Sequence, residues 1–230
     1  LLLSKDQTIR EIHHRVKNNL QTISSLLRLQ GRRLGNEEAR TAIEESVRRI
    51  RSIALVHEIL SREAGDDVPF VDVARPIVSM VQDMITSEHP IHFFLDDEGD
   101  TGVLPANLAT PLAVVLNELL QNAVDHAYPE SLDLRGCPGR VQVTIERDGE
   151  SLTLRVTDDG VGLPEGFSPE AAGGLGLSIV RTLVTSDLRG EFSILSGAGE
   201  GARRGAEVWL RVPVEAEVVD SLGGEWPSEP

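Results

Sequence analysis

The N-terminal part of the chain holds two runs of apolar positions at helical spacing. The first advances in steps of three and four, which marks one face of a long helix, and consists of Ile9, Ile12, Val16, Leu20, Ile23 and Leu27. Gly31 and the Gly35-Asn36 pair interrupt the pattern, and a second run begins at Glu37 and extends to Leu60. The sequence therefore predicts a helical hairpin over residues 1–64.

A two-helix hairpin cannot cover a continuous apolar stripe by itself. Two copies that pair as an antiparallel four-helix bundle cover it in the simplest way, so we expect this segment to form a homodimer. The alternative is a hairpin that packs on the domain following it in the same chain. Periodicity alone favours neither arrangement.

Beyond a predicted linker at residues 65–70, helical and strand patterns alternate. They predict helices near residues 71–85, 108–126 and 175–188, and strands near residues 91–95, 141–147, 151–157, 191–195 and 207–212. Helices segregated against a mostly antiparallel sheet form an α/β sandwich. The predicted fold class is therefore α+β, with a hairpin that forms a dimeric four-helix bundle followed by an α/β sandwich over residues 71–213.

Composition limits the partners and the compartment. The chain of 230 residues has 22 basic and 37 acidic side chains and a formal net charge of −15 at pH 7, which argues against a general binder of nucleic acid or of anionic membranes. The acidic segment at residues 214–230 is predicted to be disordered. The lone Cys137 excludes an intramolecular disulfide and a four-cysteine metal site, which fits a reducing compartment.

The lengths of the apolar runs and the first residues of the sequence bear on the compartment of the protein and on the extent of the chain. No apolar run reaches the roughly 18–20 residues of a membrane-spanning helix, so we expect a cytoplasmic protein. The chain begins with leucine and enters a helical pattern almost at once. We therefore expect a fragment whose upstream part is missing from this sequence.

A polar face near the end of the predicted helix at 108–126 is the first of three segments that together form a candidate nucleotide site. Glu118 and Asn122 are four residues apart and so share this face. An amide oxygen there fits Mg²⁺, which takes oxygen ligands and shares them with substrate phosphates. By itself this pattern also fits an ordinary amphipathic helix.

Two glycine-containing segments complete the candidate site. In the first, Asp158 follows a strand, and its carboxylate can accept a hydrogen bond from the adenine amine, while Gly160 and Gly162 allow the backbone to approach a ligand closely. In the second, residues 173–177 run into an apolar helix, so their amides lie at a helix N-terminus that favours phosphate. Each alone fits a plain turn; their order and spacing favour one site.

The order Glu-x-x-x-Asn, Asp-x-Gly-x-Gly, Gly-x-Gly-Leu resembles the N, G1 and G2 boxes of the GHKL ATPase superfamily, which includes gyrase, Hsp90 and histidine kinases. The resemblance covers about residues 71–213. It implies ATP and Mg²⁺ as cofactors and a mobile ATP lid at residues 163–172. It also implies that Asp158 reads adenine and that Gly160 and Gly162 shape the pocket. The remaining implied contacts are Mg²⁺ at Glu118 and Asn122, a catalytic role for Glu118, and ATP contacts from Asp125, His126, Gly174, Leu175, Gly176 and Leu177.

The first helix separates the branches of this superfamily. The segment Glu-Ile-His-His-Arg-Val-Lys-Asn-Asn-Leu-Gln at residues 11–21 is similar to the H box of a histidine kinase subfamily related to the HWE kinases. Together with Asn-Ala-x-x-His-Ala-Tyr-Pro at 122–129, it resembles soluble actinobacterial sensor kinases whose relatives carry upstream GAF and PAS domains. The resemblance implies autophosphorylation of a histidine and transfer to an aspartate of a response regulator.

Two positions depart from this pattern. Asp125 stands where many histidine kinases have a phosphate-contacting lysine, so the triphosphate is expected to rely on a cation elsewhere, such as Arg181. Ala206 follows Gly205 where Gly-Thr is common, which removes a hydroxyl that often supports the adenine-reading aspartate. Both changes concern nucleotide affinity and not the fold.

Two other functions share the ATP domain. A serine kinase of the anti-sigma-factor type phosphorylates another protein and has no reason to carry the long helix with its H box. A degenerate scaffold would dimerise and bind ATP without transferring a phosphoryl group. Asp125 and Ala206 are the only residues in the sequence that favour this alternative. Acid lability of the phosphorylated product separates these readings, because phosphohistidine is lost in acid and phosphoserine is not.

We predict that His14, and not His13, accepts the phosphate. At about 100° per residue, His13 lies roughly 50° from the centre of the apolar stripe and His14 roughly 150° away. The family pattern also places the acceptor directly before an arginine, here Arg15. His14→Gln should eliminate acid-labile labelling by ATP, whereas His13→Gln should only weaken it.

The neighbours of His14 support the same choice. Glu11 and Asn18 lie three residues before and four after it, so either can hydrogen-bond one ring nitrogen and leave the other to attack. Labelling that survives His14→Gln and is lost in His13→Gln would overturn both the helix-face argument and the alignment of the motif.

Overall fold

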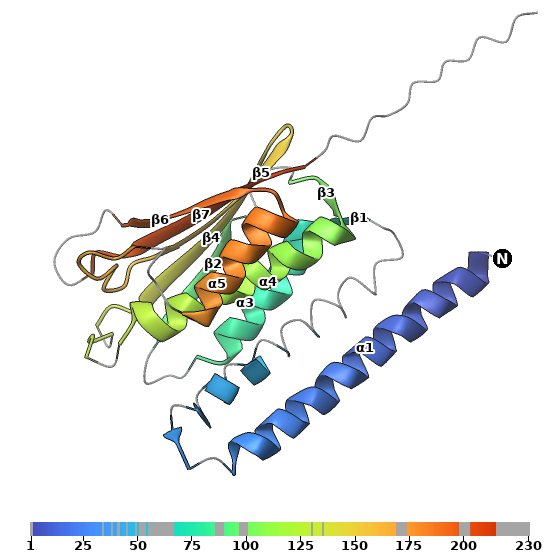
Figure 1. The fold of residues 1–230 in the computed structure, drawn as a ribbon. Helices are drawn as coiled ribbons and strands as arrows, with labels where there is room; N and C mark the ends of the chain where they lie inside the picture. Colours follow the sequence, from blue (N-terminus) through green and yellow to red (C-terminus); the bar gives the residue numbers. More distant parts are fainter. Residues whose placement is uncertain are drawn as a thin grey trace, which may run out of the picture.

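The computed structural model describes residues 2–33, 35–37, 39–40, 42–44, 46–48, 50, 54, 67–85, 90–96, 101–129, 131–134, 136–168, 174–197 and 203–214. Within these residues, a long N-terminal helix and pieces of a second helix lie beside an α/β domain (Figure 1). The tail at residues 214–230 was predicted to be disordered, and from residue 215 onward it lies outside the described residues.

The helical region matches the predicted hairpin. Helix α1 spans Leu2–Gly31, and described residues between Glu37 and Ala54 are helical after the turn. The two helices meet closely at the turn, where a Cβ on Gly31 would lie 3.2 Å from Cγ2 of Ile43. Residues 55–60, the end of the predicted second helix, lie outside the described residues.

A five-stranded sheet forms the centre of the α/β domain. Its order is β2 (Ile91–Asp96), β4 (Gly139–Asp148), β5 (Ser151–Asp158), β7 (Ala206–Pro213) and β6 (Glu191–Ser196). The β2 and β4 strands are parallel, and the other neighbours are antiparallel. In β4 and β5 buried side chains alternate with more exposed ones, so one face of the sheet is buried.

Three helices cover that face of the sheet (Figure 1). They are α3 (Phe70–Asp83), α4 (Ala106–Asn122) and α5 (Leu175–Thr182). Helix α4 lies between the other two and contacts both. Most of its second half is buried, including the polar residues Asn117 and Glu118. A buried polar pair on the central helix is costly unless it is satisfied or used, which draws attention to this part of the molecule.

A second, two-stranded sheet was not predicted. Strand β1 (Asp67–Pro69) pairs antiparallel with β3 (Val103–Pro105). Val68 and Leu104 are almost completely buried, as is Phe70 at the start of α3. The C-terminal part of the predicted linker at 65–70 is therefore incorporated in the domain, because its apolar side chains fill the core beside α3 and α4.

The predicted helices and strands agree with the observed elements to within about three residues. The predicted helix at 108–126 differs in form: α4 ends at Asn122 and a π-helical turn, η1, follows over Ala123–Ala127. The third helix likewise continues from α5 into a π-helical turn, η2, over Leu183–Asp187. Such wide turns redirect side chains and are frequent at functional sites. The α+β fold class is confirmed.

Candidate active site

A cavity of about 640 Å³ opens between the end of α4, the turn η1, the ends of β5–β7 and the start of α5. All three predicted motif segments contribute to its walls. The described lining residues that carry polar or charged side chains are Arg48, Asn117, Glu118, Gln121, Asn122, Asp125, His126 and Asp158. The remainder of the lining is mainly apolar, which is the usual character of a small-molecule site.

The first wall of the cavity is formed by the end of α4 and by η1. Glu118 and Asn122 both reach the cavity, as expected from their spacing of four residues, and Glu118 is only 2% exposed. The wide turn of η1 carries Asp125 and His126 to the cavity as well. The sequence pointed to these four residues, which are among the lining residues of this wall, but not to the change of helical pitch in η1 that carries the last two.

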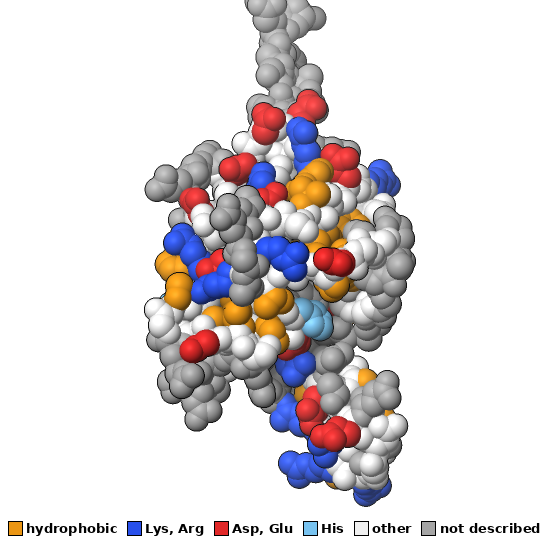
Figure 2. All heavy atoms as spheres, turned by 90° about the vertical axis from the view of Figure 1, so that its left-hand side faces the viewer, with side chains coloured by type: hydrophobic (Ala, Val, Ile, Leu, Met, Phe, Trp, Pro, Cys, Tyr) orange, Lys and Arg blue, Asp and Glu red, His pale blue; other side chains and the backbone are white. Residues whose placement is uncertain are grey.

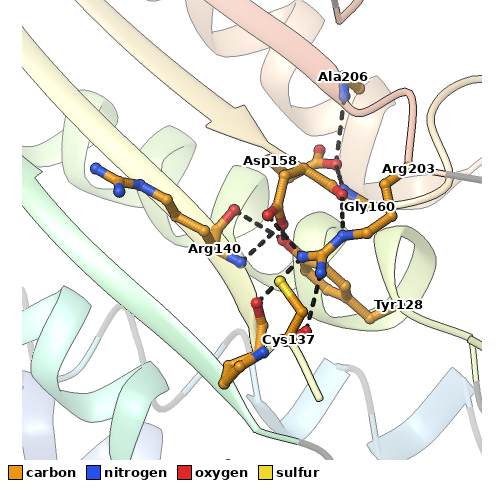
Figure 3. Close-up of polar contacts among 9 residues, drawn as sticks. Tyr128, Cys137, Arg140, Asp158, Gly160, Arg203 and Ala206 are labelled. Carbon is orange, nitrogen blue, oxygen red and sulfur yellow. Dashed lines mark hydrogen bonds and ion pairs between the residues drawn. The ribbon is translucent and has the colours of Figure 1, made fainter. Parts of the chain in front are cut away.

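Asp158 lies at the end of β5 and faces the cavity. Its Oδ1 accepts hydrogen bonds from the backbone N–H of Gly160 at 2.9 Å and of Ala206 at 3.3 Å (Figure 3). Burial raises the pKa of Asp158, and these two bonds partly oppose that rise. The backbone of Ala206 therefore supports the carboxylate even though this position lacks a side-chain hydroxyl.

The glycines after Asp158 allow the backbone to pack against η1. A Cβ on Gly160 would collide with the carbonyl oxygen of Ala127, and that oxygen accepts a hydrogen bond from the N–H of Val161 at 2.9 Å. Gly162 has a φ of +78°, a conformation that side chains with a Cβ rarely adopt. Gly162 lines the cavity. Gly160 is not among the described lining residues, and it affects the shape of the cavity through its close contact with Ala127.

The third segment meets the cavity at the start of α5. Gly174, Gly176 and Leu177 line it, and the side chain of Leu175 lies outside the described residues. Of the predicted lid at 163–172, Leu163 and Phe167 line the cavity, and residues 169–172 are not described. The predicted cation Arg181 is not among the described lining residues. Arg48, from the second helix of the hairpin, is.

The predicted acceptor region lies on α1. Its backbone is helical, but the side chains of Glu11, His13 and His14 lie outside the described residues. The side chain of Asn18 is exposed, and its backbone carbonyl accepts a hydrogen bond from Oγ1 of Thr22 at 2.9 Å. The assignment of His14 stays a prediction.

A polar network behind the cavity was not predicted (Figure 3). Nη2 of Arg203 lies 2.6 Å from Oδ2 of Asp159, and the same guanidinium donates to the carbonyls of Cys137 and Pro138. On its other side, Oδ1 of Asp159 accepts from the backbone N–H of Arg140 at 2.7 Å. The network ties the loop before β7 to the start of β4.

Tyr128 completes this network at the end of η1. Its hydroxyl oxygen lies 2.8 Å from both Oδ1 of Asp159 and the carbonyl oxygen of Arg140. Burial, followed by the interaction with Asp159, raises the pKa of Tyr128 far above its ordinary value. The sequence did contain one signal for this network, the consecutive pair Asp158-Asp159. Two adjacent carboxylates at the end of a strand face different surroundings, so only one of them can face the cavity.

Mg²⁺ is compatible with the residues that line the cavity. Among the described residues, no group of three or more His, Cys, Asp or Glu side chains is arranged to hold a metal ion. Glu118 and Asn122 offer two oxygen-bearing side chains on one helix face. This small set fits an ion that takes its remaining ligands from phosphates and water.

We predict that Asp159→Asn destabilises the protein at neutral pH and much less in acid. Burial alone would raise the pKa of Asp159, but hydrogen bonds from Arg203, the Arg140 amide and Tyr128 outweigh it, so the pKa lies below its ordinary 3.8. The stabilisation is thus present above about pH 4 and is lost as the pH falls through the lowered pKa. Because the side chain is 42% exposed, we expect about 1 kcal/mol at pH 7.

Urea unfolding at several pH values measures this effect. The free-energy difference between the parent and Asp159→Asn should shrink as the pH falls from 6 toward 2. Asp148→Asn serves as the matched control, because Asp148 is 93% exposed and lies 3.7 Å from Arg211. A difference that is constant over the whole range would contradict the role given to the Asp159 carboxylate.

Comparisons with known proteins agree with this geometry. Residues 11–87 match the family model described as "Histidine kinase", and residues 107–216 match "Histidine kinase-, DNA gyrase B-, and HSP90-like ATPase". The chain is 48% identical over 213 residues to the sensor histidine kinase PdtaS of Mycobacterium tuberculosis, covering 93% of this chain and 40% of that protein. It is 49% identical to PdtaS of Mycolicibacterium smegmatis over 213 residues, 93% of this chain and 41% of that protein. The chain thus spans about two fifths of these relatives.

A solved structure shows the same architecture. The histidine kinase domain of the EL346 blue-light-activated histidine kinase from Erythrobacter litoralis superposes with a TM-score of 0.59 at 26% identity, covering 91% of this chain and 94% of that one. The two family models follow each other in the order that the helical region and the α/β domain take here. The chain therefore belongs to the histidine kinases, with a helical histidine kinase region followed by an ATPase domain of the type shared with DNA gyrase B and HSP90.

Proposed function

We propose that this chain is the catalytic core of a sensor histidine kinase, which transfers the γ-phosphoryl group of ATP to His14. The observation that carries the proposal is the cavity with the half-buried carboxylate of Asp158 on one wall and the Glu118–Asn122 face, which includes the buried Glu118, on another. An acceptor for the adenine amine and oxygen ligands for a phosphate-bound metal are the two requirements of an ATP site.

In this proposal the two walls bind opposite ends of the nucleotide. Asp158 accepts a hydrogen bond from the adenine amine, with its orientation fixed by the amides of Gly160 and Ala206. Glu118 and Asn122 hold Mg²⁺, which offsets charge on the phosphates. Gly174 and Gly176 lie at the start of α5, where backbone amides favour the triphosphate.

The acceptor is the more exposed of two adjacent histidines on α1. The neutral imidazole of His14 attacks the γ-phosphorus in line with the bond to the departing ADP. With an ordinary pKa of about 6.5, a histidine is largely neutral at cytoplasmic pH. Glu11 or Asn18 orients the ring through one nitrogen and leaves the other to react.

The partners of the reaction follow from the family. We propose that the phosphoryl group passes from His14 to an aspartate of a response regulator receiver domain in the cytoplasm. The histidine kinase ThkA, which shares this fold at 20% identity and a TM-score of 0.50, was solved in complex with the response regulator protein TrrA. Because the curated relatives are longer, sensory domains of the GAF or PAS type are proposed to precede this segment.

We also propose that the hairpin forms a homodimer. Large apolar side chains on α1 are exposed in the single chain, at 45% for Ile23, 57% for Leu26 and 48% for Leu29. A second hairpin would cover such a face in a four-helix bundle.

No helix in the described part of the chain is long and apolar enough to cross a membrane.

Labelling with ATP tests the reaction. The chain should incorporate the γ-phosphate from labelled ATP in the presence of Mg²⁺, and the label should be lost in acid and retained in alkali, as expected of phosphohistidine. An acid-stable label would favour the serine kinase alternative, which the match of residues 11–87 to a histidine kinase model disfavours. ATP binding without labelling would favour the scaffold alternative.

Asp158→Asn tests the ATP site itself. The loss of a charge-assisted acceptor worth about 1.5–3 kcal/mol should weaken ATP binding at least about tenfold and leave the fold intact, as measured by calorimetry and circular dichroism. Since burial raises the pKa of Asp158, ATP affinity of the parent should fall in mild acid, above the ordinary pH range of aspartate titration. The variant should lack this decline. Unchanged affinity in a folded variant would refute the adenine contact.

A further inference from the structure

A basic side chain of the helical hairpin reaches the cavity of the α/β domain. Nη2 of Arg48 lies 3.7 Å from Oδ2 of Asp125 in η1, and Arg48 is one of the residues that line the cavity. Figure 2 shows the hairpin region as a lobe against the domain, with acidic and basic side chains spread over the surface of the lobe. The candidate ATP site is thus built from two parts of the chain.

The charges around the cavity make this arginine important. The described lining includes the acidic residues Glu118, Asp125 and Asp158, and Arg48 is the one Lys or Arg among the described lining residues. ATP with one bound Mg²⁺ still carries net negative charge. A cavity with three carboxylates needs a cation near the phosphates for such a ligand to bind well.

Arg48 lies at the end of the cavity where the phosphates would be. Its partner Asp125 follows Asn122 by three residues, which is close to one helical turn, and both line the cavity. If Asn122 holds the metal, the guanidinium beside Asp125 lies next to the wall that carries the metal, where the phosphates would bind. The side chains of Arg48 and Asp125 are 39% and 42% exposed, so both are accessible to a ligand.

We propose that Arg48 is a phosphate-binding residue of the ATP site, supplied by the helical hairpin and held in position by Asp125. This proposal rests on the proposed function. When ATP binds, the guanidinium donates to the terminal phosphates, for which its planar set of N–H groups is well suited. The position of the hairpin and the affinity for the triphosphate are then linked, because one residue belongs to both.

A comparison of ATP with adenosine tests this role in the full chain. Arg48→Gln should weaken Mg²⁺–ATP binding about tenfold in titration calorimetry, the lower range for hydrogen bonds to a charged group. Adenosine lacks phosphates, so its affinity should change less than about twofold. Arg48→Lys should retain part of the ATP affinity. Arg40→Gln is the matched control, because Arg40 forms an exposed ion pair with Glu37 at 3.2 Å and does not line the cavity.

A second background separates phosphate binding from simple neutralisation of Asp125. In Arg48→Gln the carboxylate of Asp125 loses this cation, and its charge alone would repel ATP. Arg48→Gln is therefore also made in the Asp125→Asn variant, where no such charge remains. If Arg48 contacts phosphate, ATP binding still weakens several-fold in this background.

Three results would overturn the inference. Unchanged ATP affinity in Arg48→Gln, or unchanged affinity in the Asp125→Asn background, would show that Arg48 does not bind phosphate. An equal loss of adenosine binding would show that the substitution distorts the cavity. If the parent chain showed no measurable binding of ATP or adenosine, the proposed function itself would be refuted. That result is distinguishable from the three results above.

Discussion

The close contact between the loop after β5 and the turn η1 determines the shape of the whole site. A side chain on Gly160 would collide with the carbonyl of Ala127, and the next amide, that of Val161, hydrogen-bonds the same oxygen. This contact brings the end of the sheet against the end of α4. Asp158 and Asn122, which are distant in sequence, therefore line one cavity. The Arg203 network then fixes the loop before β7 on the same framework.

Much of this arrangement could be predicted from periodicity and local motifs. Buried and more exposed side chains alternate along β4 and β5, and α1 carries a continuous apolar stripe. Both patterns are visible in the sequence, so these elements can be predicted from it without an alignment. Glu118, Asn122 and Asp158 were predicted as site residues because their side-chain chemistry is specific and their spacing is local. Each of these residues lines the cavity.

The unpredicted features depend on pairing between distant segments. Strand β1 is three residues long and becomes a strand only because β3 pairs with it. Arg203 binds a carboxylate 44 positions away and carbonyls 65 and 66 positions away, which no local pattern encodes. Arg48 reaches the cavity from another part of the chain, so the local search for a phosphate-binding cation pointed to Arg181 instead. The π-helical turns escape periodicity because they add only one residue to a helical turn.

Tyr128 gives the protein an optical property. It is the single tyrosine in the chain, and its hydroxyl is buried against Asp159 and the carbonyl of Arg140. An exposed tyrosine ionises near pH 10, whereas burial and the neighbouring carboxylate favour the neutral phenol here. Ionisation of Tyr128 in alkali is therefore expected to require opening of the framework behind the cavity. The absorption of tyrosinate would then report local unfolding beside the proposed nucleotide site.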